Sequence, residues 1–173
     1  MKYMFIVGCG HSGTSLMLSI WNCTKSVYAL KDETLLLENH PIEYFKRRVL
    51  GSVDTQNISW IVEKSPRHLY QLEKICNDDE SCGLIMVRNP LDTVASLVKR
   101  GIPLNKSIKR YEEDNYFCLK YEKKHNISII RYEDLVSNSS KVLSELSLKY
   151  GVDLEEGNLT RANQNTLYFT NAG

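Results

Sequence analysis

The segment Gly8–Ser15, with the sequence GCGHSGTS, constrains the fold of this chain more than any other feature. It follows the apolar run 3–7 and precedes an apolar stretch with helical character. A strand, a glycine-rich loop and a helix in this order form a cradle in which backbone N–H groups bind phosphate. Gly8 and Gly13 have the spacing of G-x-x-x-x-G-K-[ST], but Thr14 stands where that pattern has its lysine. The loop therefore predicts a phosphate ligand bound without the lysine that contacts β- and γ-phosphates in ATP-dependent enzymes.

The rest of the chain alternates between short apolar runs and longer amphipathic ones. Strands are predicted at Tyr3–Val7, Ser26–Leu30, Trp60–Glu63, Gly83–Val87 and Ile127–Arg131. Helices are predicted at Thr14–Cys23, Leu35–Leu50, Pro66–Asn77, Pro90–Arg100, Leu104–Lys124 and Ser137–Tyr150, with a loop and a short final element in Gly151–Gly173. This alternation indicates an α/β fold of three layers, in which a mainly parallel sheet of about five strands carries helices on both faces. We expect residues 1–173 to form one domain.

Charge and composition exclude some classes of function. The net charge of +1 gives no global attraction to nucleic acid or to a membrane surface. The run 106–124 contains basic and aromatic residues, but its acidic residues balance the basic ones, and we interpret it as a packed helix with ion pairs.

The sequence shows no signal peptide and no membrane-spanning run, so we expect a cytoplasmic protein. The alternative is an excised domain of a secretory-pathway protein. Nothing in the sequence indicates an oligomeric state.

The five cysteines have no metal-binding spacing, and their odd number favours a reducing compartment. Cys76 and Cys82 flank a short acidic loop and would be able to pair only in a secreted protein. Cys9 lies inside the glycine loop, where we interpret it as a small residue tolerated in a tight turn.

Polar residues follow each predicted strand, and in parallel sheets these positions meet at one edge, where ligands bind. The segments are Gly8–Ser15, Lys31–Thr34, Lys64–Pro66, Arg88–Pro90 and Tyr132–Asp134. Arg88 ends an apolar strand, and Ser96 follows eight residues later on the next predicted helix. An arginine at a strand end and a hydroxyl on the following helix can bind one phosphate together. The alternative is a loop ion pair for Arg88 and an incidental place on the helix for Ser96.

Two segments, GCGHSGTSLM and MVRNPLDTVASLVKRG, resemble the nucleotide-binding signatures of the sulfotransferase family, whose fold is P-loop NTPase-like. VEKSP at 62–66 and IIRYEDL at 129–135 resemble two further family motifs, in the same order. The resemblance implies that the donor is 3′-phosphoadenosine 5′-phosphosulfate (PAPS), that the product is 3′-phosphoadenosine 5′-phosphate (PAP), and that no metal ion is needed. It assigns the 3′-phosphate to Arg88 and Ser96 and places Tyr132 near the adenine or the 3′-phosphate. It assigns the 5′-phosphosulfate to the loop residues Gly10, His11, Ser12, Gly13, Thr14 and Ser15.

His11 stands where the sulfotransferase family usually has lysine or arginine. A protonated imidazole there would donate to the leaving phosphate oxygen and would make the reaction sensitive to pH. The alternative is a histidine that only packs in the loop.

The acceptor hydroxyl needs a base. Glu33, within KDET, resembles the glutamate that serves as base in tyrosylprotein sulfotransferases, although it could instead complement the dipole of the following helix. His40 is the second candidate for the base, and His68 and His125 are expected at the surface. Lys64 is expected to bind the transferring sulfonate, the alternative being a solvated lysine at a strand end.

The sequence thus predicts a sulfotransferase that acts on a hydroxyl of a glycan, a tyrosine or a small molecule. One alternative is a Mg²⁺-ATP-dependent kinase, for which Glu63 is the one strand-end carboxylate able to bind the metal. The other is a nucleotide-binding module without catalysis, favoured by His11 and by the lack of a clear match to the family's late Arg/Gly-rich segment. Arg161 is a weak substitute for that segment.

Overall fold

A computed structural model of the chain describes residues 1–164. Its core is a parallel five-stranded sheet with the strand order β2-β3-β1-β4-β5. The strands are β1 (Lys2–Gly8), β2 (Val27–Ala29), β3 (Trp60–Lys64), β4 (Ser81–Val87) and β5 (Ile127–Arg131). β1 is central, since Tyr3 pairs with Ile61 on one side and with Ser81 on the other. The five predicted strands are confirmed to within two residues at each end.

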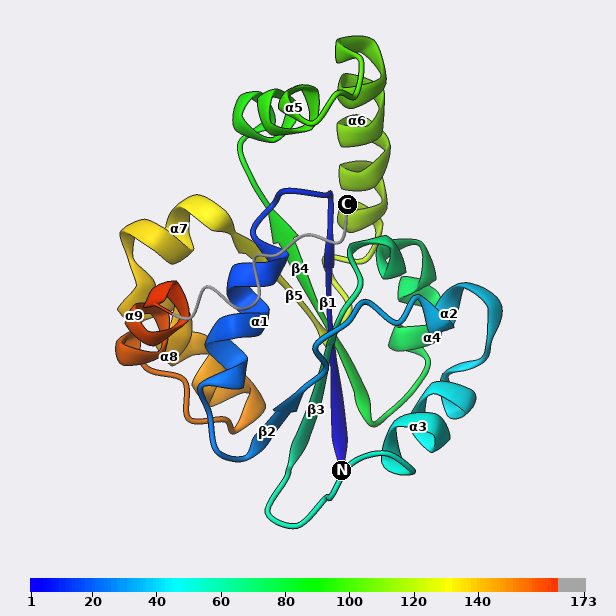
Figure 1. Ribbon diagram of the computed structural model, residues 1–173, viewed down its shortest axis with the longest axis vertical. Helices are drawn as coiled ribbons and strands as arrows, with labels where there is room; N and C mark the ends of the chain where they lie inside the picture. The colour runs from blue at the N-terminus through cyan, green and yellow to red at the C-terminus, as the bar shows by residue number, and fades with distance from the viewer. Residues whose placement is uncertain (165–173) are drawn as a thin grey trace.

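Helices cover both faces of the sheet, which confirms the predicted α/β class (Figure 1). On one face lie α1 (Thr14–Asn22), α7 (Tyr132–Ser137), α8 (Ser139–Tyr150) and α9 (Glu156–Gln164). On the other lie α2 (Leu36–Asn39), α3 (Ile42–Leu50), the 3₁₀ helix η1 (Pro66–Gln71) and α4 (Leu72–Cys76). The helices α5 (Pro90–Lys99) and α6 (Leu104–Lys120) extend beyond the edge of the sheet where β1 and β4 end (Figure 1).

The alternating side chains of β1 divide the core into two halves. Met4 and Ile6 pack with α1 and α8, where Trp21 and Trp60 meet edge to face at 5.7 Å between ring centroids. Tyr3, Phe5 and Val7 pack on the opposite face, around Phe45 of α3 and Ile75 of α4. A central strand that is apolar on both faces is what a parallel sheet covered by helices requires.

Three predicted helices differ in detail from those of the structure. The predicted helix 35–50 is two helices, because His40 is extended before Pro41 and cannot continue α2. The predicted helix 66–77 begins as the 3₁₀ helix η1, and the predicted helix 104–124 ends at Lys120. The segment before α8 adds the separate short helix α7. None of these breaks moves the strand ends that form the site.

The short final element predicted after residue 151 is α9, and the remainder of that prediction, 165–173, lies outside the described residues. Over residues 1–164, no helix has both the length and the apolar character needed to cross a membrane. All five cysteines are free thiols, so the alternative Cys76–Cys82 bridge is wrong for this structure.

Candidate active site

The glycine loop runs from the end of β1 to the first turn of α1, and two of its glycines are required by close contacts. Gly8 has φ +147°, and a Cβ there would lie 2.3 Å from the carbonyl oxygen of Met86. Gly13 has φ +98°, and a Cβ there would lie 2.5 Å from Cδ2 of Tyr132. No side chain of the described residues caps α1, so the first N–H groups of that helix are free for a ligand.

A cavity of about 450 Å³ opens at the carboxyl ends of the strands, directly over this loop. It is lined by Gly10, His11, Gly13, Thr14, Ser15, Leu16, Glu33, Lys64, Pro66, Arg67, Arg88, Ser96, Arg100, Arg110, Tyr132 and Asn163. Every residue assigned to the site from the sequence is present except Ser12. Ser12 is fully buried within the loop, and its Oγ has no hydrogen-bond partner among the described residues. The Ser12 side chain therefore does not line the cavity, and binding of the ligand by Ser12 stays a prediction.

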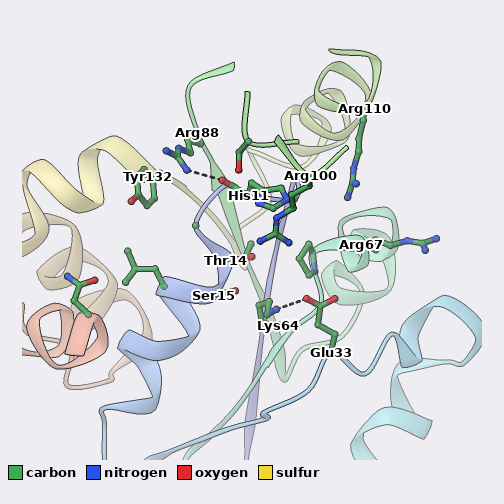
Figure 2. Close-up of a pocket in the computed structure, with 16 residues that line it drawn as sticks. His11, Thr14, Ser15, Glu33, Lys64, Arg67, Arg88, Arg100, Arg110 and Tyr132 are labelled. Carbon is green, nitrogen blue, oxygen red and sulfur yellow. Dashed lines mark hydrogen bonds and ion pairs between the residues drawn. The ribbon is translucent and has the colours of Figure 1, made fainter. Parts of the chain in front are cut away.

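Arg88 extends from the end of β4 toward the loop (Figure 2). Its Nη1 donates to the carbonyl oxygen of His11 at 3.3 Å, and its guanidinium stacks 4.5 Å from the ring centroid of Tyr132. Asn89 caps α5 by accepting from the N–H of Leu91 at 2.9 Å. This cap starts α5 directly after Arg88, so that Ser96 of α5 lines the same cavity.

Glu33 and Lys64 form an ion pair on the opposite side of the cavity, with 2.5 Å between Oε1 and Nζ (Figure 2). Lys64 ends β3, and Glu33 lies in the segment that follows β2, so neighbouring strands bring the two together. The side chain of Glu33 remains 43% exposed, which leaves it accessible to a molecule entering the cavity. The structure thus places both predicted residues at the site and pairs them with each other.

Glu63, one residue before Lys64, is buried in a hydrogen-bond network below the cavity floor. Its Oε1 accepts from the N–H and the hydroxyl of Thr34, at 3.1 and 3.2 Å, and from the hydroxyl of Ser65. Its Oε2 accepts from Nδ1 of His68 at 3.0 Å, and Nε2 of His68 accepts from the N–H of Leu37 at 3.2 Å. The prediction of a surface position for His68 is wrong, since its side chain is 0% exposed.

This network also removes the basis for Glu63 as a metal ligand, because both of its oxygens already accept hydrogen bonds. Within residues 1–164, no three His, Cys, Asp or Glu side chains gather in a group that could hold a metal ion. The function of the network is positional: it attaches the segment that carries Glu33 to the end of β3.

His11 has φ +71°, a left-handed conformation that histidine adopts more readily than most residues. Burial lowers its pKa below the usual value, and the neighbouring Arg100, Arg110 and Arg88 lower it further. This lowered pKa favours the neutral imidazole in the free protein at pH 7, and a protonated His11 beside a bound donor stays a prediction. His40, the second candidate for the base, does not line the cavity and stacks on Tyr44 at 4.2 Å.

Three arginines of the cavity were not assigned to it from the sequence: Arg67 of η1, Arg100 at the end of α5 and Arg110 of α6. Each resembles an ordinary exposed charge in the sequence, because its role depends on which way its helix faces. Only Arg100 has a readable signal, since it follows Ser96 by four residues and shares its helix face. Arg161 is absent from the cavity and pairs with Glu155 at 3.1 Å, so its suggested role in closing the site is wrong for this structure.

The remaining expectations near the loop agree with the structure. Burial raises the pKa of the Cys9 thiol, which accords with a packing role. In α6, ion pairs join Lys109 to Glu113 at 3.7 Å and Arg110 to Asp114 at 3.6 Å. The predicted packed and salt-bridged helix is therefore confirmed.

Comparison with known structures identifies this arrangement of strands and helices. A sulfotransferase domain from the curacin biosynthetic pathway superposes with a TM-score of 0.75 at 19% identity, covering 99% of this chain and 81% of that one. A sulfotransferase from Alicyclobacillus acidocaldarius has a TM-score of 0.65 at 14% identity, covering 90% and 84%. The chain has the sulfotransferase fold.

A mouse sulfotransferase, SULT7A1, solved in complex with PAP, has this fold as well, with a TM-score of 0.61 at 16% identity over 99% of this chain and 67% of that one. No protein-family model matches the sequence, and no curated protein matches it. The predicted P-loop NTPase-like fold of sulfotransferases is thus confirmed from structure.

Proposed function

We propose that the chain is a PAPS-dependent sulfotransferase that moves a sulfuryl group to a hydroxyl acceptor. The observation that carries the proposal is the convergence of the glycine loop, Arg88, Ser96 and Tyr132 on one cavity in a sulfotransferase fold. A structural neighbour with PAP bound supports the choice of nucleotide.

The residues present fit such a donor. The 3′-phosphate would be bound by the guanidinium of Arg88 and the hydroxyl of Ser96. The 5′-phosphosulfate would lie on the loop residues Gly10–Ser15 and the free N–H groups of α1. When bound, PAPS supplies the sulfuryl group that is transferred. A cavity with five cationic side chains and one acidic side chain is suited to this polyanion.

The acceptor side of the cavity would be formed by Glu33 and Lys64. The carboxylate of Glu33 would take the proton of the acceptor hydroxyl, and Lys64 would bind the sulfonate oxygens. In the free protein their ion pair keeps the two side chains together, and bound substrates would separate them. His11 would donate a hydrogen bond to the donor phosphate from within the loop.

Calorimetric titration with PAP, AMP and ATP, the last with and without Mg²⁺, tests the proposal. PAP should bind more tightly than AMP, because Arg88 and Ser96 are assigned to the extra 3′-phosphate. Equal affinities would refute this assignment, and ATP binding that strengthens with Mg²⁺ would favour a kinase.

Turnover of PAPS should then be measured against pooled glycan, tyrosyl-peptide and small alcohol or phenol acceptors. Sulfation of any of them supports an enzyme. PAP binding without sulfation of any acceptor would instead support a nucleotide-binding module.

A further inference from the structure

Two arginines of the cavity are not used in the proposed binding of the donor. Arg67 lies on η1 and Arg110 lies on α6, and both line the cavity over the glycine loop. Figure 2 shows them on one side of this cavity, with Arg88 and Tyr132 on the opposite side. Arg67 and Arg110 therefore lie away from the residues assigned to the 3′-phosphate.

A second cavity adjoins the first on the side of these two arginines. It has a volume of about 280 Å³, and it is lined by Gly8, Arg67, Leu69, Tyr70, Arg110 and Asp114. Arg67 and Arg110 line both cavities, so they mark the boundary between the two. Ligand pockets commonly have volumes of about 300–1,000 Å³, so a cavity of this size suits one small ring rather than a second nucleotide.

Each arginine is paired in a way that leaves part of its guanidinium for a ligand. Nε of Arg67 pairs with Glu38 at 3.1 Å, and Nε of Arg110 pairs with Asp114 at 3.6 Å. Within residues 1–164, the Nη groups of both arginines form no hydrogen bond. A guanidinium that is paired through Nε keeps its two Nη groups, which can bind both oxygens of a carboxylate.

Asp114 joins the two helices that carry these arginines. Its buried carboxylate on α6 accepts a hydrogen bond from the hydroxyl of Tyr70 on η1, and it also pairs with Arg110. The ring of Tyr70 packs edge to face on Phe117 of α6, with 5.0 Å between the ring centroids. The two arginines thus come from helices in direct contact, which lowers the cost of ordering the pair when a ligand binds.

We infer that Arg67 and Arg110 bind a carboxylate of the acceptor, so that the acceptor is an anionic hydroxy compound. The inference rests on the function proposed above and names the class of acceptor. Glu33 lines the first cavity together with both arginines, so an acceptor can present its hydroxyl to Glu33 and its carboxylate to the arginines. A neutral acceptor would leave two guanidiniums beside it without an anionic partner.

Matched pairs of acceptors test the inference by turnover. 4-Hydroxyphenylacetate and 4-hydroxyphenylacetamide share one phenol and differ in charge, and methyl glucuronide and its uronamide are the equivalent pair of sugars. In whichever pair is sulfated, kcat/KM should be about 10- to 100-fold higher for the carboxylate, as expected for hydrogen bonds to a charged group. Equal values for the carboxylate and the amide would overturn the inference.

Binding tests the same preference without turnover. In calorimetric titrations of the PAP-saturated protein, at least one of the two carboxylates should bind more tightly than its own amide. The pair that shows the difference also tells whether the acceptor is a phenol or a sugar. If neither carboxylate binds more tightly than its amide, the inference fails, whether or not an acceptor is sulfated.

Variants assign the preference to the two arginines. Arg67→Gln should lower it by about tenfold, and this variant should fold because the side chain of Arg67 is 62% exposed. Arg67→Gln with Arg110→Gln should remove the preference entirely while keeping the affinity for PAP. Arg48→Gln is the matched control, since Arg48 is an exposed residue of α3 that lines neither cavity.

Two outcomes separate this inference from the proposed function. If Arg67→Gln weakens PAP binding as much as it weakens the preference for the carboxylate, Arg67 binds the nucleotide and the inference is overturned. A chain that binds PAP more tightly than AMP and sulfates amide and carboxylate equally is a sulfotransferase without the inferred acceptor site. Equal affinities for PAP and AMP would instead refute the proposed function, and the inference would fail with it.

Discussion

Replacing Glu63 by glutamine tests how strongly the buried network below the cavity stabilises the fold. The carboxylate accepts four hydrogen bonds, from the N–H and hydroxyl of Thr34, the hydroxyl of Ser65 and Nδ1–H of His68. A glutamine retains the shape and one acceptor oxygen but replaces the other oxygen by an NH₂ group. If that NH₂ faces His68, two donors oppose each other. If His68 moves its proton to Nε2, the N–H of Leu37 loses its acceptor instead.

The magnitude follows from these bonds. One buried donor left without a partner costs about 1–3 kcal/mol. The three bonds that remain change from charge-assisted to neutral, which weakens each by about 0.5–1 kcal/mol. The expected loss in the free energy of unfolding is therefore about 2.5–6 kcal/mol, or a fall in Tm of about 5–24 °C for a chain of this length.

Urea unfolding followed by circular dichroism measures this loss. Glu80→Gln is the matched control, because Glu80 is 58% exposed and its partner Lys46 also pairs with Asp78. The control should change the free energy of unfolding by less than about 1 kcal/mol. In a double-mutant cycle, Glu63→Gln and His68→Ala should be strongly non-additive. A loss for Glu63→Gln no larger than that of the control would refute the view that Glu63 is held by four donors.

Further predictions concern the loop and its surroundings. Gly13→Ala should lower the free energy of unfolding by about 1–2 kcal/mol through its left-handed conformation alone, and it should weaken PAP binding by displacing Tyr132. Gly51→Ala is the control, because Gly51 has φ −70° and only ordinary contacts, so it should change neither property. Urea unfolding measures the first effect and calorimetry the second. PAP should raise the pKa of His11, which is low in the free protein. The affinity of the wild-type protein for PAP should therefore rise, relative to that of His11→Gln, as pH falls below about 6.5. Parallel profiles of affinity against pH for the two proteins would contradict this. Cys118, whose pKa burial raises to about 12, should resist iodoacetamide at pH 8 in the native protein, and its rapid labelling on a mass-spectrometric time course would contradict the buried position.

The strands and the ends that form the site could be predicted because their signals are local. β5 has the predicted bounds, 127–131, and β1, β3 and β4 differ from prediction by two residues or fewer. A short apolar run bounded by polar residues does not depend on the rest of the chain to be recognised. The rule that parallel strands present their carboxyl ends at one edge then places residues far apart in sequence in one cavity.

The parts that could not be predicted depend on which way a helix faces. His68 sits in a polar segment, yet η1 turns it toward Glu63 and away from solvent. Arg110 is one of many charges in α6, and only the packing of that helix beside the loop brings its guanidinium within 3.1 Å of where a Cβ of Gly10 would stand. The break between α2 and α3 is different, because Pro41 marks it in the sequence. A single helix is predicted there only because the apolar residues on the two sides of Pro41 have helical spacing.

The distribution of charge would explain how the loop could bind the proposed phosphosulfate without the lysine of an ATP-binding loop. Thr14 and Ser15 contribute a helix N-terminus, which binds an anion through N–H groups and a partial charge only. The full charges come from outside the loop, from strand ends at Arg88 and Lys64 and from the end of α5 at Arg100. Charges on separate elements can be directed to separate ends of one ligand, so binding of the 3′-phosphate and binding of the transferring sulfonate need not share a residue. Variants of Arg88 and Lys64 should therefore lose different properties, nucleotide discrimination in the first and turnover in the second.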